Sequence, residues 1–407
     1  MRMTKQELHT KAQFILALLI AFTLPFARLT PVFIALMLLN WLIEGDFKNK
    51  FAVLVRNKWF WLFELLYFIH LIGMIYTANL PSGLFDLEVK FSIFIFPIIF
   101  CSRPLKVDLI NQILKVFCVA AIIASIAMLS RATFLFATKG ENDFFYEAFS
   151  FLIHPSYLSM YINFLLVWIL LGLFGKGGVR ANLKPLYSWI LIVFFFIINV
   201  LLSSKMGMIS MLILFFSFGI YYITLSKKYL LGAFAIVIFI SAILFSSVYI
   251  PAIEHRVSFA IAALTKNEIK KTSDESSEVR MLIWKTANEI IRDHPIIGVG
   301  TGDAKDVLLE EYAKRGMTGA IEHKLNAHNE FYQVFISLGI IGFITLLANL
   351  FFPLVQAIKD KNLMIIFFLL IIIFNYLPES MLETQAGVMF YAFFNSLLCF
   401  NSTNNQH

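Results

Sequence analysis

The chain has 407 residues, of which 59% are hydrophobic and only 14% are charged. A water-soluble protein of this length needs more polar surface, so the composition excludes a soluble globular fold. The formal net charge of +7 lies mainly in short segments between apolar runs, where it indicates membrane orientation rather than binding to nucleic acid.

Apolar runs recur along the whole chain, and most are about as long as the 20-residue helix that crosses a hydrocarbon core of ~30 Å. We therefore predict an all-α membrane protein with about twelve transmembrane helices. The predicted spans cover residues 12–27, 30–45, 59–76, 88–101, 110–130, 155–174, 186–203, 206–226, 229–250, 331–357, 363–378 and 386–400. No small-residue cleavage site follows the first run, so we expect an anchor and not a cleaved signal peptide.

Lysine and arginine residues are concentrated in alternate connections between the predicted spans. The connection before the third span, for example, carries Lys48, Lys50, Arg56 and Lys58, whereas the connection between the first two spans carries only Arg28. This alternation predicts that both termini lie in the cytoplasm. The chain then divides into residues 1–250 with nine spans, an outward polar loop at 251–330, and residues 331–407 with three spans and a cytoplasmic tail.

The outward loop contains two predicted helices. Apolar residues from Val279 to Ile291 recur at helical spacing, and Pro295 ends that run. A second helix is expected from Asp303 to Arg315, closed by Gly316. The segment 265–278 is polar, and we expect it to be solvated.

Three residues are the leading candidates for chemistry. His328 lies where the loop meets a long apolar run, and the positive end of a helix dipole there favours the neutral imidazole that a general base requires. Arg280 lies one turn before Trp284, and its guanidinium suits a diphosphate. Lys205 lies in an outward turn between two spans, where an ammonium could meet a lipid-linked phosphate. The alternatives are a helix-capping histidine, a solvated arginine and a snorkelling lysine.

Other ionisable residues lie near or within the spans. His154 opens the sixth span and Arg28 lies between the first two; either could line a site or serve structure alone. Glu64, His70 and Lys115 fall in apolar surroundings where charges are costly and often functional, although Glu64 and Lys115 could pair with each other. Glu379 and Glu383 bracket the last outward turn and could contact a substrate or a cation.

We expect no metal and no cofactor. The three cysteines lie in apolar runs without metal-ligand spacing. The acidic pair Asp86 and Glu88 partly enters a predicted helix, and Asp274, Glu275 and Glu278 lie in the solvated segment. The glycine-rich stretch 298–302 could hold a phosphate through its N–H groups, but it lacks the lysine and the preceding strand of a nucleotide-binding loop.

The spacing of these residues resembles a known family. Arg280 is followed after three residues by Trp284, and His328-Asn329 is followed by nine residues, Gly339, two residues and Gly342. These patterns resemble R-x3-L and H-[NSQ]-x9-G-x2-[GTY] of the O-antigen ligase and Wzy polymerase superfamily. Trp284 replaces the leucine, and Lys205 stands where the family usually has arginine.

The resemblance implies a GT-C-like fold and a place in the bacterial inner membrane, with the loop in the periplasm. It implies metal-independent transfer of a glycan from undecaprenyl diphosphate to an acceptor hydroxyl, as in lipopolysaccharide biosynthesis. His328 would be the base, and Arg280 and Lys205 would hold the diphosphate. From their positions beside these residues or at the same outer face, we also predict Arg28, His154, Asn329 and Trp284 as substrate contacts. We favour the lipid A core as acceptor.

Other functions stay open at this point. A polymerase that joins repeat units, or a protein O-oligosaccharyltransferase, would use the same donor with another acceptor. A transporter or flippase for lipid-linked sugars belongs to a different class, and it predicts broken helices with polar residues near the bilayer midplane. This sequence instead concentrates its polar candidates at the outer interface and in one loop.

Overall fold

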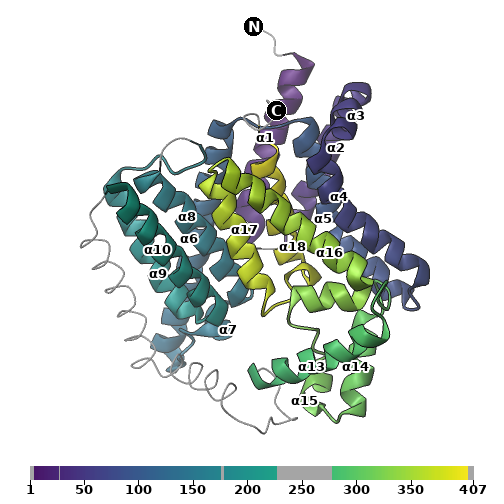
Figure 1. Ribbon diagram of the computed structural model, residues 1–407. Coiled ribbons are helices and arrows are strands. Elements are labelled where there is room, and N and C mark those ends of the chain that lie inside the picture. The colour runs from purple at the N-terminus through teal and green to yellow at the C-terminus, as the bar shows by residue number, and fades with distance from the viewer. Residues whose placement is uncertain (1–3, 27, 176–177, 227–276, 402–407) are drawn as a thin grey trace.

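The computed structural model describes residues 4–26, 28–175, 178–226 and 277–401, and every regular element in these ranges is a helix (Figure 1). The elements are α1 (Lys5–Thr23), η1 (Leu24–Phe26), α2 (Thr30–Glu44), α3 (Phe47–Arg56), α4 (Lys58–Gly73), η2 (Met74–Tyr76), α5 (Leu80–Ser102), α6 (Val107–Lys139), α7 (Tyr146–Phe149), α8 (Pro155–Phe174), α9 (Pro185–Leu202), α10 (Lys205–Ser226), α13 (Ser277–Asp293), α14 (Ala304–Lys314), α15 (Thr318–Glu322), α16 (Glu330–Lys359), α17 (Leu363–Tyr376), η3 (Met381–Glu383) and α18 (Gln385–Cys399).

The described helices are those of a multi-pass membrane protein. Six are long and apolar enough to cross a membrane, or seven if α2 and α3, which meet at 113°, form one span. Helices α17 and α18 and the first part of α10 are apolar but shorter. Each predicted span within the described residues overlaps a helix, whereas the predicted ninth span at 229–250 and loop residues 251–276 lie outside them.

Two helices extend well beyond the spans predicted from the sequence. Helix α5 begins at Leu80 instead of residue 88, because Asn79 caps it by accepting a hydrogen bond from the Ser82 N–H and Pro81 stands in its first turn. Asp86 and Glu88 therefore lie within a helix rather than on a loop. Helix α6 continues to Lys139, beyond the predicted end at residue 130, and Gly140 closes it in a left-handed conformation.

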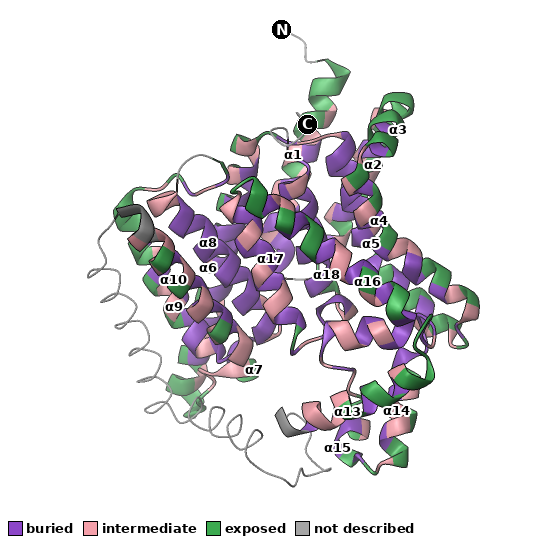
Figure 2. Cartoon of the chain, viewed as in Figure 1, coloured by how far each residue is buried: buried purple, intermediate pink, exposed green. Residues whose placement is uncertain are grey.

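Buried residues form one large core and one small one. The large core runs through the membrane helices, and almost the whole of α8 is buried between α9, α10 and α17 (Figure 2). The small core joins α13 to α14 and α15, with Ile283, Leu308 and Tyr312 fully buried. The two loop helices predicted from sequence are thus confirmed as α13 and α14, with Gly316 after α14 at φ 67°.

Helix α16 is interrupted at Gly339, where φ is 62° and ψ is −159°. The Ile336 and Ser337 carbonyls, freed by this break, accept hydrogen bonds of 2.9 Å from the N–H groups of Val299 and Gly300. A Cβ atom at position 339 would lie 2.3 Å from the backbone of Ile296, so only glycine fits. The stretch 298–302 therefore uses N–H groups to hold α16, and the outward loop is fixed to the membrane bundle there.

Candidate active site

Glu379 joins the two main candidate residues from the outward loop. Its Oε1 accepts a hydrogen bond from Arg280 Nη2 at 2.7 Å, and its Oε2 lies 3.3 Å from His328 Nδ1. The side chain of Glu379 is 19% exposed, that of Arg280 24% and that of His328 23%, so a substrate can still reach all three. Arg280 comes from α13, His328 from the turn before α16, and Glu379 from the segment between α17 and α18.

His328 is held by its backbone. Its φ of 44° is uncommon for a residue other than glycine, and its N–H donates to Asn326 Oδ1 at 3.0 Å. The next residue, Asn329, donates its own N–H to Ser380 Oγ and caps α16 by accepting from the Tyr332 N–H at 3.1 Å. Asn329, and not His328, is therefore the helix cap, which leaves the imidazole available for other contacts.

Trp284 supports the same turn from α13. Its indole Nε1 donates to the Ala327 carbonyl at 3.1 Å, and its ring stacks on Tyr332 with centroids 6.2 Å apart. Arg280 lies one turn earlier on the same helix and reaches Glu379, which faces His328 of this turn, in agreement with the predicted shared face. The indole N–H is used by the backbone, and direct contact of Trp284 with substrate stays a prediction.

The charge of Glu379 defines the state of the cluster. Burial of Glu379 acts to raise its pKa, but the hydrogen bond with His328 and the charge of Arg280 outweigh burial, so the pKa lies below its usual value. A carboxylate can only accept, so the facing Nδ1 of His328 carries the proton when the ring is neutral. The lone pair then lies on Nε2, as a general base requires.

A second ionic cluster fixes the turn that carries Glu379. Lys90 of α5, which is almost fully buried, contacts Asp86 and donates to Glu383 Oε1 at 2.9 Å. Glu330 Oε2 accepts from the Leu382 N–H at 2.7 Å. Asp86 is thus paired with a lysine, and among the residues that the structure describes no three His, Cys, Asp or Glu side chains are grouped to hold a metal ion.

The remaining candidates lie at separate points. His154 caps α8, and its Nε2 lies 3.4 Å from Glu147. Lys205 begins α10, which packs against α8 and α17, and Arg28 is exposed between η1 and α2. The roles of His154, Lys205 and Arg28 in a site stay predictions.

No hydrogen bond or ion pair among the described residues joins Glu64, His70 or Lys115 to the cluster around Glu379. Neither oxygen of buried Glu64 has a hydrogen-bond partner in the described part of the chain, so the suggested pairing with Lys115 is wrong there. His70 Nδ1 lies 2.8 Å from the Leu66 carbonyl oxygen of its own helix. Lys115 lines a cavity at the start of α6.

Glu379 was identified in the sequence only as a possible substrate or cation contact. Its partnership with His328 crosses 51 residues of sequence and depends on how the segment after α17 folds back on the start of α16. The sequence offered one signal for this partnership. Glu379 is an acidic residue between two apolar runs, on the same outer side as the basic candidates Arg280 and His328.

Residues 190–347 match the sequence model of a family described as O-antigen ligase. The matched range contains Lys205, Arg280, His328 and Gly339, so the resemblance predicted from their spacing is confirmed. A protein from Haemophilus influenzae, named only as uncharacterized, is 24% identical over 187 residues, which are 43% of this chain and 46% of that protein. The chain therefore aligns with less than half of that relative's length.

Proposed function

We propose, on the premise that residues 190–347 belong to the O-antigen ligase family, that this membrane protein transfers a glycan from undecaprenyl diphosphate to an acceptor hydroxyl of the lipid A core. The observation that carries the proposal is the contact of both Arg280 and His328 with Glu379. A base and a cation are thereby held next to each other on a surface that substrate can reach. Glycosyl transfer needs both.

The base is His328. Its Nε2 takes the proton of the acceptor hydroxyl as that oxygen attacks the anomeric carbon, and the bond from this carbon to the diphosphate oxygen breaks. The acquired charge on the imidazolium is balanced by Glu379, which faces Nδ1 at 3.3 Å. Glu379 is therefore a positioning residue that fixes the ring and its tautomer.

The departing diphosphate requires cations. Arg280 uses Nη2 for Glu379, whereas its Nε and Nη1 make no hydrogen bond to another described residue and can donate to phosphate oxygens. Lys205 is proposed as the second cation. Arg28, His154, Asn329 and Trp284 are proposed to contribute substrate contacts around the same surface, directly or through the turn before α16.

The proposed setting is the bacterial inner membrane with twelve spans, cytoplasmic termini and the outward loop in the periplasm. The apolar bundle would hold the polyprenyl chain, and α13 to α15 would cover the diphosphate and the sugar. The transfer is proposed to be metal-independent, with the two cations stabilising the leaving group.

The test is a reconstituted reaction. Purified full-length protein receives undecaprenyl-diphosphate glycan together with a lipid A core, a second lipid-linked repeat unit or a serine-rich acceptor protein, and the products are weighed by mass spectrometry. We expect a mass gain on the lipid A core. A gain on a different acceptor instead would replace the ligase proposal by polymerase or protein glycosylation, and movement of the donor across vesicles without any product would support a transporter.

A further inference from the structure

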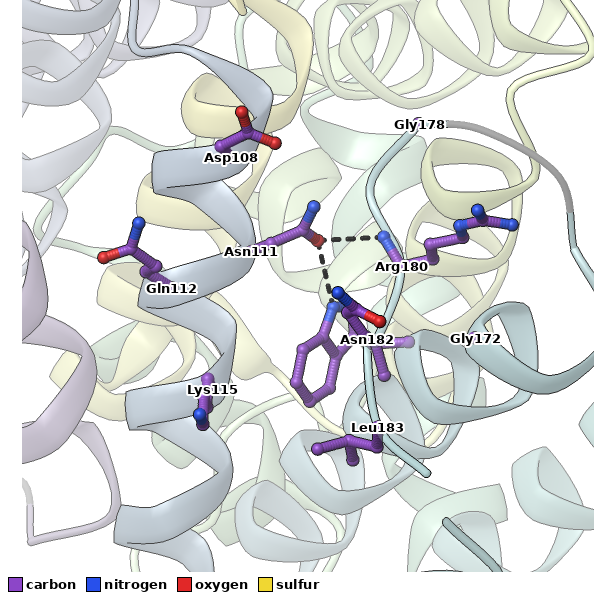
Figure 3. Close-up of a pocket in the computed structure, with 11 residues that line it drawn as sticks. Asp108, Asn111, Gln112, Lys115, Gly172, Gly178, Arg180, Asn182 and Leu183 are labelled. Atoms are coloured by element: carbon purple, nitrogen blue, oxygen red, sulfur yellow. Dashed lines mark hydrogen bonds between the residues drawn. The ribbon is translucent and has the colours of Figure 1, made fainter. Parts of the chain in front are cut away.

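A second polar site lies at the other end of the bundle. A cavity of about 570 Å³ opens between the first turns of α6, the end of α8 and the connection that leads to α9 (Figure 3). In Figure 1 this connection lies away from α13 to α15. The polar and charged side chains that line the cavity are Asp108, Asn111, Gln112, Lys115, Arg180 and Asn182.

The walls of this cavity are built by specific contacts. Asn111 Oδ1 accepts hydrogen bonds from Trp168 Nε1 at 3.2 Å and from the Arg180 N–H at 2.9 Å, which fastens the connection to both helices (Figure 3). The Ala181 N–H donates to the Trp168 carbonyl at 3.0 Å. At Gly172 a Cβ atom would lie 2.3 Å from the Ala181 carbonyl oxygen, so the close approach requires glycine. The cavity is therefore preformed.

The lining side chains of α6 form one stripe. Asp108, Asn111, Gln112 and Lys115 follow the i, i+3, i+4, i+7 spacing of a single helix face. Of these, the side chains of Asp108, Gln112 and Lys115 make no hydrogen bond or ion pair with any residue in the described ranges. Charged side chains at the end of a membrane helix that are left without protein partners are available to a ligand.

The depth of the stripe suits a lipid headgroup. Helix α6 has 33 residues, and at 1.5 Å per residue its length of about 50 Å exceeds the ~30 Å hydrocarbon core by about 20 Å. If this excess is shared by both ends, Lys115, about 12 Å from the helix start, lies at the boundary of the hydrocarbon. Asp108 then lies further out, among headgroups.

The same helix face becomes apolar beyond Lys115. Val119 and Ile126, four and eleven residues further along, are 45% and 50% exposed. The face therefore presents, in order, an acid, amides, a base and then exposed aliphatic side chains. An amphiphile with both charges in its head and a hydrocarbon tail complements this order.

We propose that this cavity binds the headgroup of a phosphoethanolamine phospholipid. Lys115 contacts the phosphate, Asp108 contacts the ammonium, and the acyl chains lie along Val119 and Ile126. In such a lipid the phosphate is the charge nearer the acyl chains and the ammonium is further out, which is the order of Lys115 and Asp108 on the helix. A headgroup with negative charge alone would be repelled by Asp108.

The test measures lipid binding by native mass spectrometry of the full-length protein in detergent. The probes are a phosphatidylethanolamine, a phosphatidylglycerol with the same acyl chains, the matching diacylglycerol, and water-soluble glycerophosphoethanolamine. We expect the phosphatidylethanolamine to bind about tenfold better than each of the others, as a charge-assisted contact provides. Equal binding of the two phospholipids would overturn the headgroup assignment, and equal binding of the soluble headgroup would overturn the acyl-chain assignment.

Three variants locate the site. Lys115→Gln should weaken phosphatidylethanolamine binding about tenfold, and Asp108→Asn should remove the preference over phosphatidylglycerol. Lys106→Gln removes the same kind of charge two residues before Asp108, on an exposed residue that does not line the cavity. It should bind lipid as the wild type does. Unchanged binding in the first two variants, or an equal loss in all three, would show that the cavity is not the site.

Discussion

At the end of the bundle that carries α13 and α16, Arg280 and His328 both contact Glu379, whereas Asp108 and Lys115 at the start of α6 share a cavity without an ion pair among the described residues. An ion pair fixes the position and the protonation state of a base, and general-base catalysis requires both. Partnerless charges at a membrane boundary favour recognition of another molecule. We therefore propose different tasks for the two ends, catalysis at the first and lipid binding at the second.

The largest expected effect is a loss of glycan transfer that occurs at the first end of the bundle and not at the second. His328→Ala should lower glycan transfer by at least about a hundredfold, because a general base contributes 10²- to 10⁴-fold. Transfer is measured with the reconstituted donor and lipid A core, after gel filtration has shown that the variant is folded. Lys115→Gln is the matched substitution at the other end, and it should keep transfer near the wild-type rate. An equal loss in both variants would show that the two ends do not act separately.

Lys205 tests whether charge or shape holds the diphosphate. Lys205→Ala should lower transfer by about a hundredfold, since it removes one donor that stabilises the leaving group. Lys205→Arg should stay active, because arginine keeps the charge and is the residue that the family pattern usually has here. The two rates are compared under the same conditions. Equal activity of both variants would exclude a diphosphate role for Lys205.

Glu379→Gln tests what the contacts of Glu379 with Arg280 and His328 contribute to catalysis. The amide can still accept from Nδ1, but its NH₂ group would face either Arg280 or His328, which are themselves donors, so we expect a loss of about ten- to a hundredfold in kcat with a smaller change in KM. Glu379→Asp should recover part of the loss. A role confined to folding predicts a lower yield of active protein with an unchanged kcat per folded molecule, so active-site titration decides between them.

The parts of this architecture that depend on local sequence were predictable. Helix positions followed from the length of apolar runs, and α13 and α14 followed from helical spacing and from Gly316. Arg280 and His328 were singled out by their spacing, and both contact Glu379 in the structure, whereas their catalytic roles stay predictions. Each of these signals lies within a short stretch of chain.

What depends on long-range contact was not predictable. Glu379 meets His328 only because the segment after α17 returns to α16, and the break at Gly339 shows itself only through contacts with Val299 and Gly300. The sequence shows that position 339 is a glycine, but it does not show which backbone contact requires one. The early start of α5 was missed because Asp86 and Glu88 suggested a loop, whereas Lys90 pairs with Asp86 inside the protein.

Gly339 links the outward loop to the membrane bundle, and its replacement should loosen that link. Gly339→Ala combines a φ of 62° with a Cβ atom 2.3 Å from the Ile296 backbone, so we expect a loss of about 1–3 kcal/mol and faster proteolysis of the loop. Gly316→Ala is the control, since its φ of 67° is similar but nothing lies within 4 Å of the added Cβ. Thermal unfolding of both variants measures the difference. If the two lose equal stability, then the backbone conformation matters and the docking contact with Ile296 does not.

The smallest expected effect is a change in thermal stability at acidic pH. Because the pKa of folded Glu379 lies below its ordinary value of 4.5, its partnership with Arg280 and His328 stabilises the fold at neutral pH, and this stabilisation is lost as the pH falls through the folded pKa. Wild type and Glu379→Gln should therefore differ most in melting temperature above pH 5 and converge toward pH 3. Other carboxylates titrate in the same range, so the difference between the two curves is the quantity that matters. Parallel curves from pH 7 to pH 3 would mean that ionisation of Glu379 adds nothing to stability, which would contradict the lowered pKa.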